Sequence, residues 1–319
     1  MKASAVAHPI QGLIKYHGLE DERLRLPFHD SISVCTAPLA TRTTIEFGEG
    51  ETSSATIGEE PATGREFERI ADVVGPVLRL AGADLKFKMM SENNFSSNIG
   101  LGASSSGFAA LALASCRALG LELSDKEVSR IARRGAASAA RSVTGAFSRL
   151  RRGIGDVDTY SQQIASEDLE MGIIVALVPA FKRTEDAHRD APSSPFFRSR
   201  LAEMPMMIDK MELAIRQREV GRICELAERD TLMLHGITMT GATEMLLWRP
   251  ETMSVILKVR NMRERGIPAF FSIDTGATVY VNTFPDRVKE VRAEIEDLGV
   301  DTIECTVGGA AREVKDHLF

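Results

Sequence analysis

The chain has 319 residues, of which 44% are hydrophobic and 26% are charged, and its formal net charge at pH 7 is −6. This length allows about two domains with sizeable cores, and an acidic chain with scattered Lys and Arg residues argues against a nucleic-acid-binding protein. The four cysteines lie far apart and form no CxxC pair, which favours a reduced, cytoplasmic protein without a zinc site. No apolar run reaches membrane-spanning length, and the first residues lack the apolar core of a signal peptide.

The first 145 residues alternate between strand and helix patterns. In chain order, the pattern predicts strands over 31–37 and 42–47, a helix over 65–80, a strand over 85–90 and an Ala-rich helix over 104–119. Ser124 and Glu127 form a capping-box pattern, so a further helix is predicted from there toward Arg141.

The second half begins with a Gly- and Arg-rich stretch at 145–158, interpreted as a loop, and continues with a strand over 173–179. A polar stretch at 182–195 with two prolines is the predicted boundary between domains 1–185 and 186–319. Beyond it, the pattern predicts two or three helices over 198–234, a helix over 250–266, strands over 269–273 and 279–283, a helix over 286–298 and a strand over 302–307. This order indicates an α+β second domain.

The most informative stretch is a polar, Gly-containing loop that runs into three serines at the start of the Ala-rich helix. Gly100 and Gly102 allow the backbone to approach an anion closely. Ser104, Ser105 and Ser106 supply hydroxyl groups for phosphate oxygens or Mg²⁺, beside the positive end of the helix. No Gly-Lys-Ser/Thr follows, so this is not the common P-loop. From the loop alone, a phosphate cradle and an ordinary Ser-capped helix are equally favoured.

The loop resembles motif 2 of the GHMP kinases, and four further segments resemble the mevalonate diphosphate decarboxylase branch of that superfamily. These segments are Lys15-Tyr-His-Gly, Leu26-Pro-Phe-His-Asp-Ser-Ile-Ser-Val, Ser138-Ala-Ala-Arg-Ser and Asp274-Thr-Gly-Ala, which occur in family order. The sequence departs from the family near Ser96, where a Pro is usual, at His17, where Trp is usual, at Leu19 and Glu20, where a basic residue is usual, and over 182–188. With these departures, the chain resembles the phosphomevalonate decarboxylases of archaea and some bacteria.

The resemblance implies a two-domain GHMP kinase fold, with a βαβ-containing N-terminal ATP-binding domain and a C-terminal ferredoxin-like α+β domain. It implies ATP-dependent decarboxylation of mevalonate 5-phosphate to isopentenyl phosphate, with ATP and Mg²⁺ as cofactors and a homodimeric assembly. Three alternatives stay open: decarboxylation of the diphosphate, a mevalonate-type kinase that does not decarboxylate, and a non-catalytic sensor with the same fold.

The resemblance also implies roles for individual residues. The catalytic set is Asp274 as base, Lys15 as a cation beside it and Arg141 as a carboxylate-binding fork. The substrate-binding set is Tyr16, Arg69, Ser138 and Thr184. The ATP-binding set is Asn98, Gly100, Gly102, Ser104, Ser105 and Ser106, and Ser105 is also the predicted Mg²⁺ ligand. The competing structural interpretations are a turn-capping Asp274, a surface Arg141 and Lys15 on an edge strand.

Overall fold

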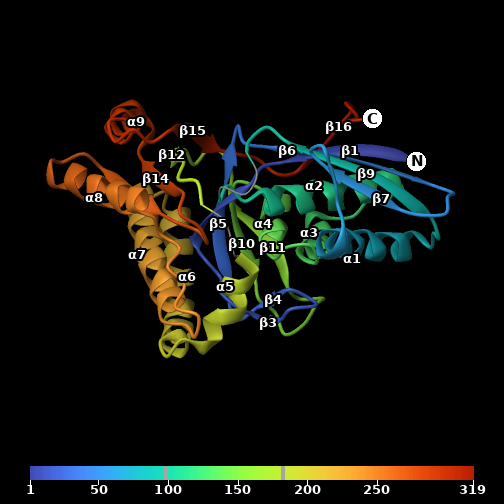
Figure 1. Ribbon diagram of the computed structural model, residues 1–319, viewed down its shortest axis with the longest axis horizontal. Helices are drawn as coiled ribbons and strands as arrows, with labels where there is room; N and C mark the ends of the chain where they lie inside the picture. The colour runs from blue at the N-terminus through green and yellow to red at the C-terminus, as the bar shows by residue number, and fades with distance from the viewer. Residues whose placement is uncertain (97–99, 181–183) are drawn as a thin grey trace.

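The computed structural model describes residues 1–96, 100–180 and 184–319, and it consists of two large sheets with helices packed on them (Figure 1). Asn98 therefore lies outside the described residues. Thr184 is described only as the first residue of a helix, and its side chain also lies outside. Within the described ranges, no helix has the length and apolar character needed to cross a membrane.

The first sheet has six strands in the order β16-β1-β6-β9-β7-β8. Their bounds are β1 Lys2–Ala7, β6 Thr41–Gly48, β7 Ser54–Ile57, β8 Glu60–Pro61, β9 Lys86–Asn93 and β16 Arg312–Val314. All pairs are antiparallel except β7 with β9, which are parallel. The chain between these two strands includes helix α1, Gly64–Ala81, so this part of the sheet contains a βαβ unit.

Helices α1 and α2, Ala103–Ala118, lie with α3, Asp125–Arg133, on one face of this sheet (Figure 1). Helix α1 buries one stripe, which includes Ile70, Val73 and Val77, as its helical periodicity predicts. Helix α2 is buried on nearly all sides, because its Ala-rich sequence allows the sheet, α1 and α3 to approach closely.

The second sheet follows the order β11-β10-β5-β15-β12-β14-β13, and β2 also pairs with β5. The bounds are β2 Ile10–Ile14, β5 Ser31–Ala37, β10 Phe147–Arg151, β11 Tyr160–Ala165, β12 Gly172–Ala176, β13 Ala269–Ser272, β14 Val279–Thr283 and β15 Thr302–Val307. A small hairpin joins β3, Leu19–Asp21, to β4, Leu26–Pro27. Strand β2 leads directly into Lys15, so this sheet positions one predicted catalytic residue.

The remaining helices are α4 Ala139–Thr144, α5 Thr184–Asp190, α6 Phe197–Arg216, α7 Val220–Met239, α8 Pro250–Glu264 and α9 Val288–Glu296. Short 3₁₀ turns cover Ala191–Ser193 and Pro285–Arg287. Helices α6 and α7 pack side by side, and α7 also contacts β2 and β13 (Figure 1). Helix α7 therefore approaches both the strand before Lys15 and the strand before Asp274.

Most of the predicted elements are confirmed, and two predictions are wrong. The stretch at 145–158 is not all loop, because β10 lies within it and pairs with both β5 and β11 through a buried Phe147 and Leu150. The helix capped by Ser124 is confirmed with both capping-box bonds, but it ends at Arg133 and a separate helix, α4, carries Arg141. Gly135 stands in the break, where the ring of Phe108 leaves no room for a side chain.

The mixed α+β architecture that the sequence predicts is confirmed. The predicted domain boundary remains a prediction, and three strand pairings bear on it. Strand β12 lies between β14 and β15, and β16 pairs with β1 at the opposite end of the chain. Each pairing joins strands from the two sides of residue 185.

Candidate active site

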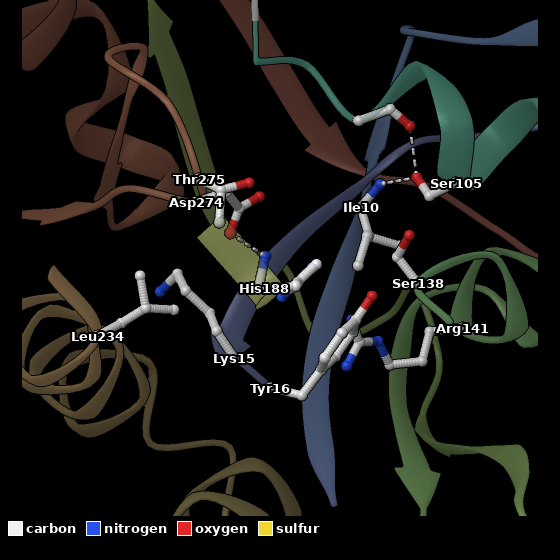
Figure 2. A pocket seen from close by; sticks show the side chains of 12 residues that line it. Ile10, Lys15, Tyr16, Ser105, Ser138, Arg141, His188, Leu234, Asp274 and Thr275 are labelled. Carbon is white, nitrogen blue, oxygen red and sulfur yellow. Dashed lines mark hydrogen bonds between the residues drawn. The ribbon is translucent and has the colours of Figure 1, made fainter. Parts of the chain in front are cut away.

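A cavity opens where the N-terminus of α2, helix α4, helix α7 and the turn after β13 converge (Figure 2). All three predicted catalytic residues line it. The lining residues are Ile10, Gly12, Lys15, Tyr16, Gly102, Ser105, Ser138, Arg141, His188, Leu234, Asp274 and Thr275. Segments from both ends of the chain thus contribute to one site.

Asp274 lies on the turn that follows β13, and it is tied to two neighbouring elements. Its Oδ1 accepts a hydrogen bond from the backbone N–H of Gly12 at 3.1 Å. A Cβ at Gly12 would lie 2.8 Å from the same oxygen, so only glycine permits this approach. Behind the turn, Nε2 of His235 lies 3.0 Å from the carbonyl oxygen of Asp274. Burial lowers the pKa of His235 to about 3, so the neutral ring donates this bond.

The Lys15 ammonium is buried, with 5% exposure, and is held by two hydroxyl groups. Its Nζ donates to Thr231 Oγ1 at 3.1 Å and to Ser272 Oγ at 2.9 Å. Thr231 donates its own hydrogen to Ala227 O, and Ser272 donates its own to Gly12 O. Both hydroxyls therefore present lone pairs to Lys15, which orients the ammonium.

Asp230, on α7, is fully buried and provides the counter-charge for Lys15. Its Oδ2 accepts the Lys15 backbone N–H at 2.9 Å and lies 3.6 Å from Nζ. Its Oδ1 accepts from Arg200 Nη2 at 2.7 Å, and the same nitrogen donates to the Lys15 carbonyl oxygen. Burial lowers the pKa of Lys15, and the carboxylates of Asp230 and Asp274 oppose that shift.

Sequence reasoning missed Asp230 and Arg200, although the sequence contains a signal for each. Asp230 lies three residues after the buried Ala227 and four before the buried Leu234, and so falls on the apolar face of α7. Arg200 similarly lies four residues before the buried Met204 on α6. A charged residue on an apolar helix face requires a buried partner, and these two residues partner each other and Lys15.

Arg141 is also buried, with 2% exposure, so its interpretation as a surface arginine is wrong. Its Nη1 donates to the Ser31 hydroxyl, and its guanidinium carbon lies 5.7 Å from the centre of the Tyr16 ring. Its Nε is buried and has no hydrogen-bond partner among the described residues. A buried guanidinium with an unused donor, facing a cavity, is suited to binding an anion.

The start of α2 forms another wall of the cavity, through Gly102 and Ser105. Gly100 and Gly102 both have positive φ values, 88° and 73°, and no side chain of the described residues caps the helix. The Ser105 N–H donates to Gly102 O at 2.7 Å, so the N–H groups of Ala103 and Ser104 are the ones that point to an anion at the helix start. The turn that carries Asp274 lies close to this loop, since a Cβ at Gly276 would be 3.7 Å from Gly100 Cα.

The three serines of α2 have different surroundings. Ser104 is exposed. Ser105 lines the cavity, donates to Gly102 O at 2.6 Å and accepts from the Ile10 N–H at 3.2 Å (Figure 2). Ser106 does not reach the cavity, because its hydroxyl is buried 2.5 Å from Thr41 Oγ1. Ser106 therefore connects α2 to β6, whereas Ser105 faces the cavity and Ser104 is exposed to solvent.

The four predicted substrate-binding residues are only partly brought together. Tyr16 and Ser138 line the cavity, and Thr184 lies at the start of α5. Arg69 does not line it: Nε donates to Gly135 O at 2.9 Å, and Nη1 lies 3.5 Å from Glu185 Oε1. Arg69 still acts on the site electrostatically. Burial raises the pKa of Tyr16, and the charges of Arg141, Arg25 and Arg69 oppose that shift.

Among the described residues, no cluster of three or more His, Cys, Asp or Glu side chains could hold a metal ion. Mg²⁺ at nucleotide sites is usually bound through phosphate oxygens and water, with one or two protein ligands. The hydroxyls of Ser104 and Ser105 are the groups at the helix start that would contact such an ion.

The comparisons with known proteins agree with this geometry. A family model described as the diphosphomevalonate decarboxylase-like N-terminal domain matches residues 7–161. A phosphomevalonate decarboxylase from Haloferax volcanii is 49% identical over 99% of this chain and 98% of its own length. The chain belongs to the mevalonate diphosphate decarboxylase family of the GHMP kinases.

Solved structures of the family have the same fold. A mevalonate diphosphate decarboxylase from Staphylococcus aureus superposes with a TM-score of 0.93 at 27% identity, covering 98% of each chain. A complex of MDDEF with MVAPP, AMPPCP and magnesium superposes with a TM-score of 0.92 at 25% identity, covering 99% of each chain. The resemblance found in the sequence and the GHMP kinase fold are both confirmed.

Proposed function

We propose that this protein catalyses the ATP-dependent decarboxylation of mevalonate 5-phosphate to isopentenyl phosphate, releasing ADP, phosphate and carbon dioxide. The 49% identical relative is a phosphomevalonate decarboxylase. The absence of a basic residue at Leu19 and Glu20 also favours the monophosphate, because a diphosphate carries more negative charge for the protein to balance.

A single observation carries the proposal: Asp274, Lys15, Arg141 and the start of α2 face one cavity. A base, a cation, a carboxylate-binding fork and a phosphate-binding helix end are the four groups that the reaction requires. Among the described residues, none of these groups lies in a separate site.

The first step is phosphorylation of the tertiary C3 hydroxyl of the substrate. Asp274 accepts the hydroxyl proton as the oxygen attacks the γ-phosphorus of ATP, and the bond from that phosphorus to the β-phosphate oxygen breaks to release ADP. Lys15 stabilises the negative charge that develops on the oxygen. The Gly12 N–H and the His235 bond fix Asp274 in this orientation.

The second step is elimination from the C3 phosphate. The C3–O bond breaks with loss of phosphate, and the electrons of the bond to the carboxylate carbon form the alkene as carbon dioxide leaves. Arg141 holds the carboxylate before it leaves, through its unpartnered Nε and a guanidinium fixed by Ser31. The cavity thus aligns the departing phosphate and the departing carboxylate.

ATP and Mg²⁺ are the cofactors in this proposal. The α2 start offers unpaired N–H groups and the hydroxyls of Ser104 and Ser105 to the ATP phosphates, and Mg²⁺ would offset phosphate charge there. The MDDEF complex contains AMPPCP and magnesium, which supports this assignment. Asn98 remains a predicted ATP contact outside the described residues.

The test is to incubate purified protein with ATP and Mg²⁺, offering mevalonate 5-phosphate and mevalonate 5-diphosphate in parallel. The proposal expects isopentenyl phosphate, carbon dioxide and ADP in equal amounts from the monophosphate, at a higher kcat/KM than from the diphosphate. ADP without carbon dioxide would instead identify a kinase. No turnover of either substrate would favour the sensor.

We also propose that the protein acts in the cytoplasm as a homodimer, as its family resemblance implies. Light scattering during size-exclusion chromatography tests the assembly, and a mass equal to one chain would contradict it. Fractionation of the source cells tests the location.

A further inference from the structure

A second cavity adjoins the first on the far side of His188. It is lined by Leu19, Glu22, Arg25, Arg65, Glu185, His188, Arg189 and Pro192. His188 lines both cavities, and its ring stacks on Tyr16 with 5.0 Å between the ring centres. A substrate bound at the first cavity can therefore extend past Tyr16 toward the second.

Arg25 is the most unusual residue of this second cavity. It lies just before β4 in the hairpin from β3, with a positive φ of 51°, which non-glycine residues adopt rarely. Its side chain is nevertheless buried, with 7% exposure for the residue. A buried arginine on a strained backbone is a feature that occurs at ligand-binding sites.

Arg25 and Arg69 share one carboxylate. Glu185 Oε1, on α5, lies 2.9 Å from Arg25 Nη2 and 3.5 Å from Arg69 Nη1. Burial opposes ionisation of Glu185, but the Arg25 hydrogen bond and the Arg69 charge lower its pKa, so it is ionised at neutral pH. Two positive charges and one negative charge leave this group, which we call the Arg25–Arg69–Glu185 cluster, with a net charge of +1.

The family resemblance places the 5-phosphate of the substrate at Arg69, and we propose that Arg25 completes this phosphate site and that Glu185 selects against a second phosphate. This inference rests on the proposed function and specifies its substrate class. A phosphate monoester carries about −1.5 to −2 charges at pH 7. Arg25 and Arg69 attract this charge, whereas the further negative charge of a diphosphate would lie beside the Glu185 carboxylate.

Arg25 also bears on the missing basic residue at Leu19, where the sequence departs from the family pattern. The basic residue that the family resemblance places at 19 is absent, and Arg25 lines the same cavity as Leu19 from the same hairpin. Arg25, just before β4, therefore supplies one positive charge near Leu19, and Glu185 partly offsets it.

The main test is Glu185→Gln, which keeps the shape of the side chain and raises the cluster from +1 to +2. Glu185 is 43% exposed, so the substitution does not open a core. We expect kcat/KM for mevalonate 5-diphosphate, divided by that for mevalonate 5-phosphate, to rise by about tenfold, since like-charge repulsion at a binding site is removed. The fold is checked by the thermal midpoint, which should change little.

Asp186→Asn is the matched control. Asp186 is the next residue on α5 and is exposed, and its Oδ1 lies 3.7 Å from Arg189 Nη1. The Asp186→Asn substitution removes one negative charge from the same helix and leaves Arg25, Arg69 and Glu185 unchanged. The specificity ratio should stay within about twofold of the wild type. Equal ratios in the Glu185→Gln variant and the wild type, or equal changes in both variants, would overturn the inference.

A second variant tests Arg25 directly. Arg25→Asn removes the guanidinium and introduces a residue that tolerates positive φ. We expect KM for mevalonate 5-phosphate to rise about tenfold or more with kcat nearly unchanged, because the residue acts in binding. An unchanged KM would remove Arg25 from the site. If wild-type protein turns over neither substrate, the proposed function fails instead, so the two failures are distinguishable.

Discussion

The two cavities that share His188 balance their charges differently. We call the first cavity, with Lys15 and Asp274, the inner end of the cleft, and the second cavity, with Arg25 and Glu185, its outer end. At the inner end, Lys15 and Arg200 are matched by Asp230 and Asp274, two positive and two negative charges. At the outer end, Arg25, Arg65, Arg69 and Arg189 lie around Glu22 and Glu185, four positive charges against two. The inner end is complete without a ligand, whereas the outer end gains its balance from an anionic one.

This difference has a physical reason. Groups that stabilise a transition state work best when they are held in place beforehand, and Lys15 is fixed by two hydroxyls and a carboxylate. Groups that bind an anion must keep positive charge available, even though burial lowers the pKa of both Arg69 and Arg141. Four substitutions test this contrast between the ends.

The largest effect is expected from Asp274→Asn. The amide keeps the shape but cannot accept the hydroxyl proton, so kcat should fall by roughly 10²–10⁴-fold. ATP affinity, measured by calorimetry, should stay close to that of the wild type, because Asp274 does not belong to the α2 start. Turnover at the wild-type rate would exclude Asp274 as the base.

Arg141→Lys should have the next largest effect. A lysine retains the positive charge but loses the planar fork and the Nε donor, so kcat/KM for the phosphorylated substrate should fall roughly 10–100-fold. Steady-state measurement of carbon dioxide release checks this. A variant as active as the wild type would show that a point charge is sufficient at this position.

Asp230→Asn tests the inner end through its pH dependence. Asp230 raises the pKa of Lys15, so its removal lowers that pKa further, and protonated Lys15 is lost at lower pH. The alkaline limb of the kcat profile, measured over a series of buffers, should therefore move to lower pH. The acidic limb should stay in place, because Asp274 and its bond from Gly12 are unchanged.

The same change leaves Arg200 and Lys15 without their carboxylate and should lower the free energy of unfolding by about 3–5 kcal/mol. Denaturant titration measures this loss. Lower stability with an unmoved alkaline limb would mean that Asp230 supports only the fold, and Lys15 would then not depend on it.

Ser106→Ala should have the smallest effect. It should distinguish the structural role of Ser106 from the ATP contact predicted for Ser104. It removes the bond to Thr41 and should cost about 1 kcal/mol of stability, with KM for ATP unchanged. Ser104→Ala is the matched control, because that exposed hydroxyl is a predicted ATP contact and its loss should raise KM for ATP instead. The opposite pattern would reverse the two assignments.

The local elements of the fold were largely predictable. Strands Ser31–Ala37 and Thr302–Val307 have the predicted bounds, and the capping box at Ser124 forms as expected. Strand β10 was missed because its Gly- and Arg-rich surroundings resemble a loop, and only pairing with β5 and β11 makes it a strand. Local preference is overridden when a segment lies between two partner strands.

Parts of the site were predictable for a different reason. The resemblance identified Lys15, Arg141 and Asp274 together, and all three line one cavity. It did not identify Asp230, Arg200, Arg25 or Glu185. Ordinary charged residues carry no motif, and their roles depend on which partners the packing brings within hydrogen-bond distance.

The sequence by itself determined most of the helices and strands, the position of the Ser-rich helix start and the family that the chain resembles, because periodicity, capping and short motifs are local. Only the tertiary structure decided that Gly12 contacts Asp274, that Asp230 balances Lys15 and that one carboxylate joins Arg25 to Arg69. A hydrophobic stripe specifies that a face is buried, but the identity of the facing residue is set by the packing of the whole chain.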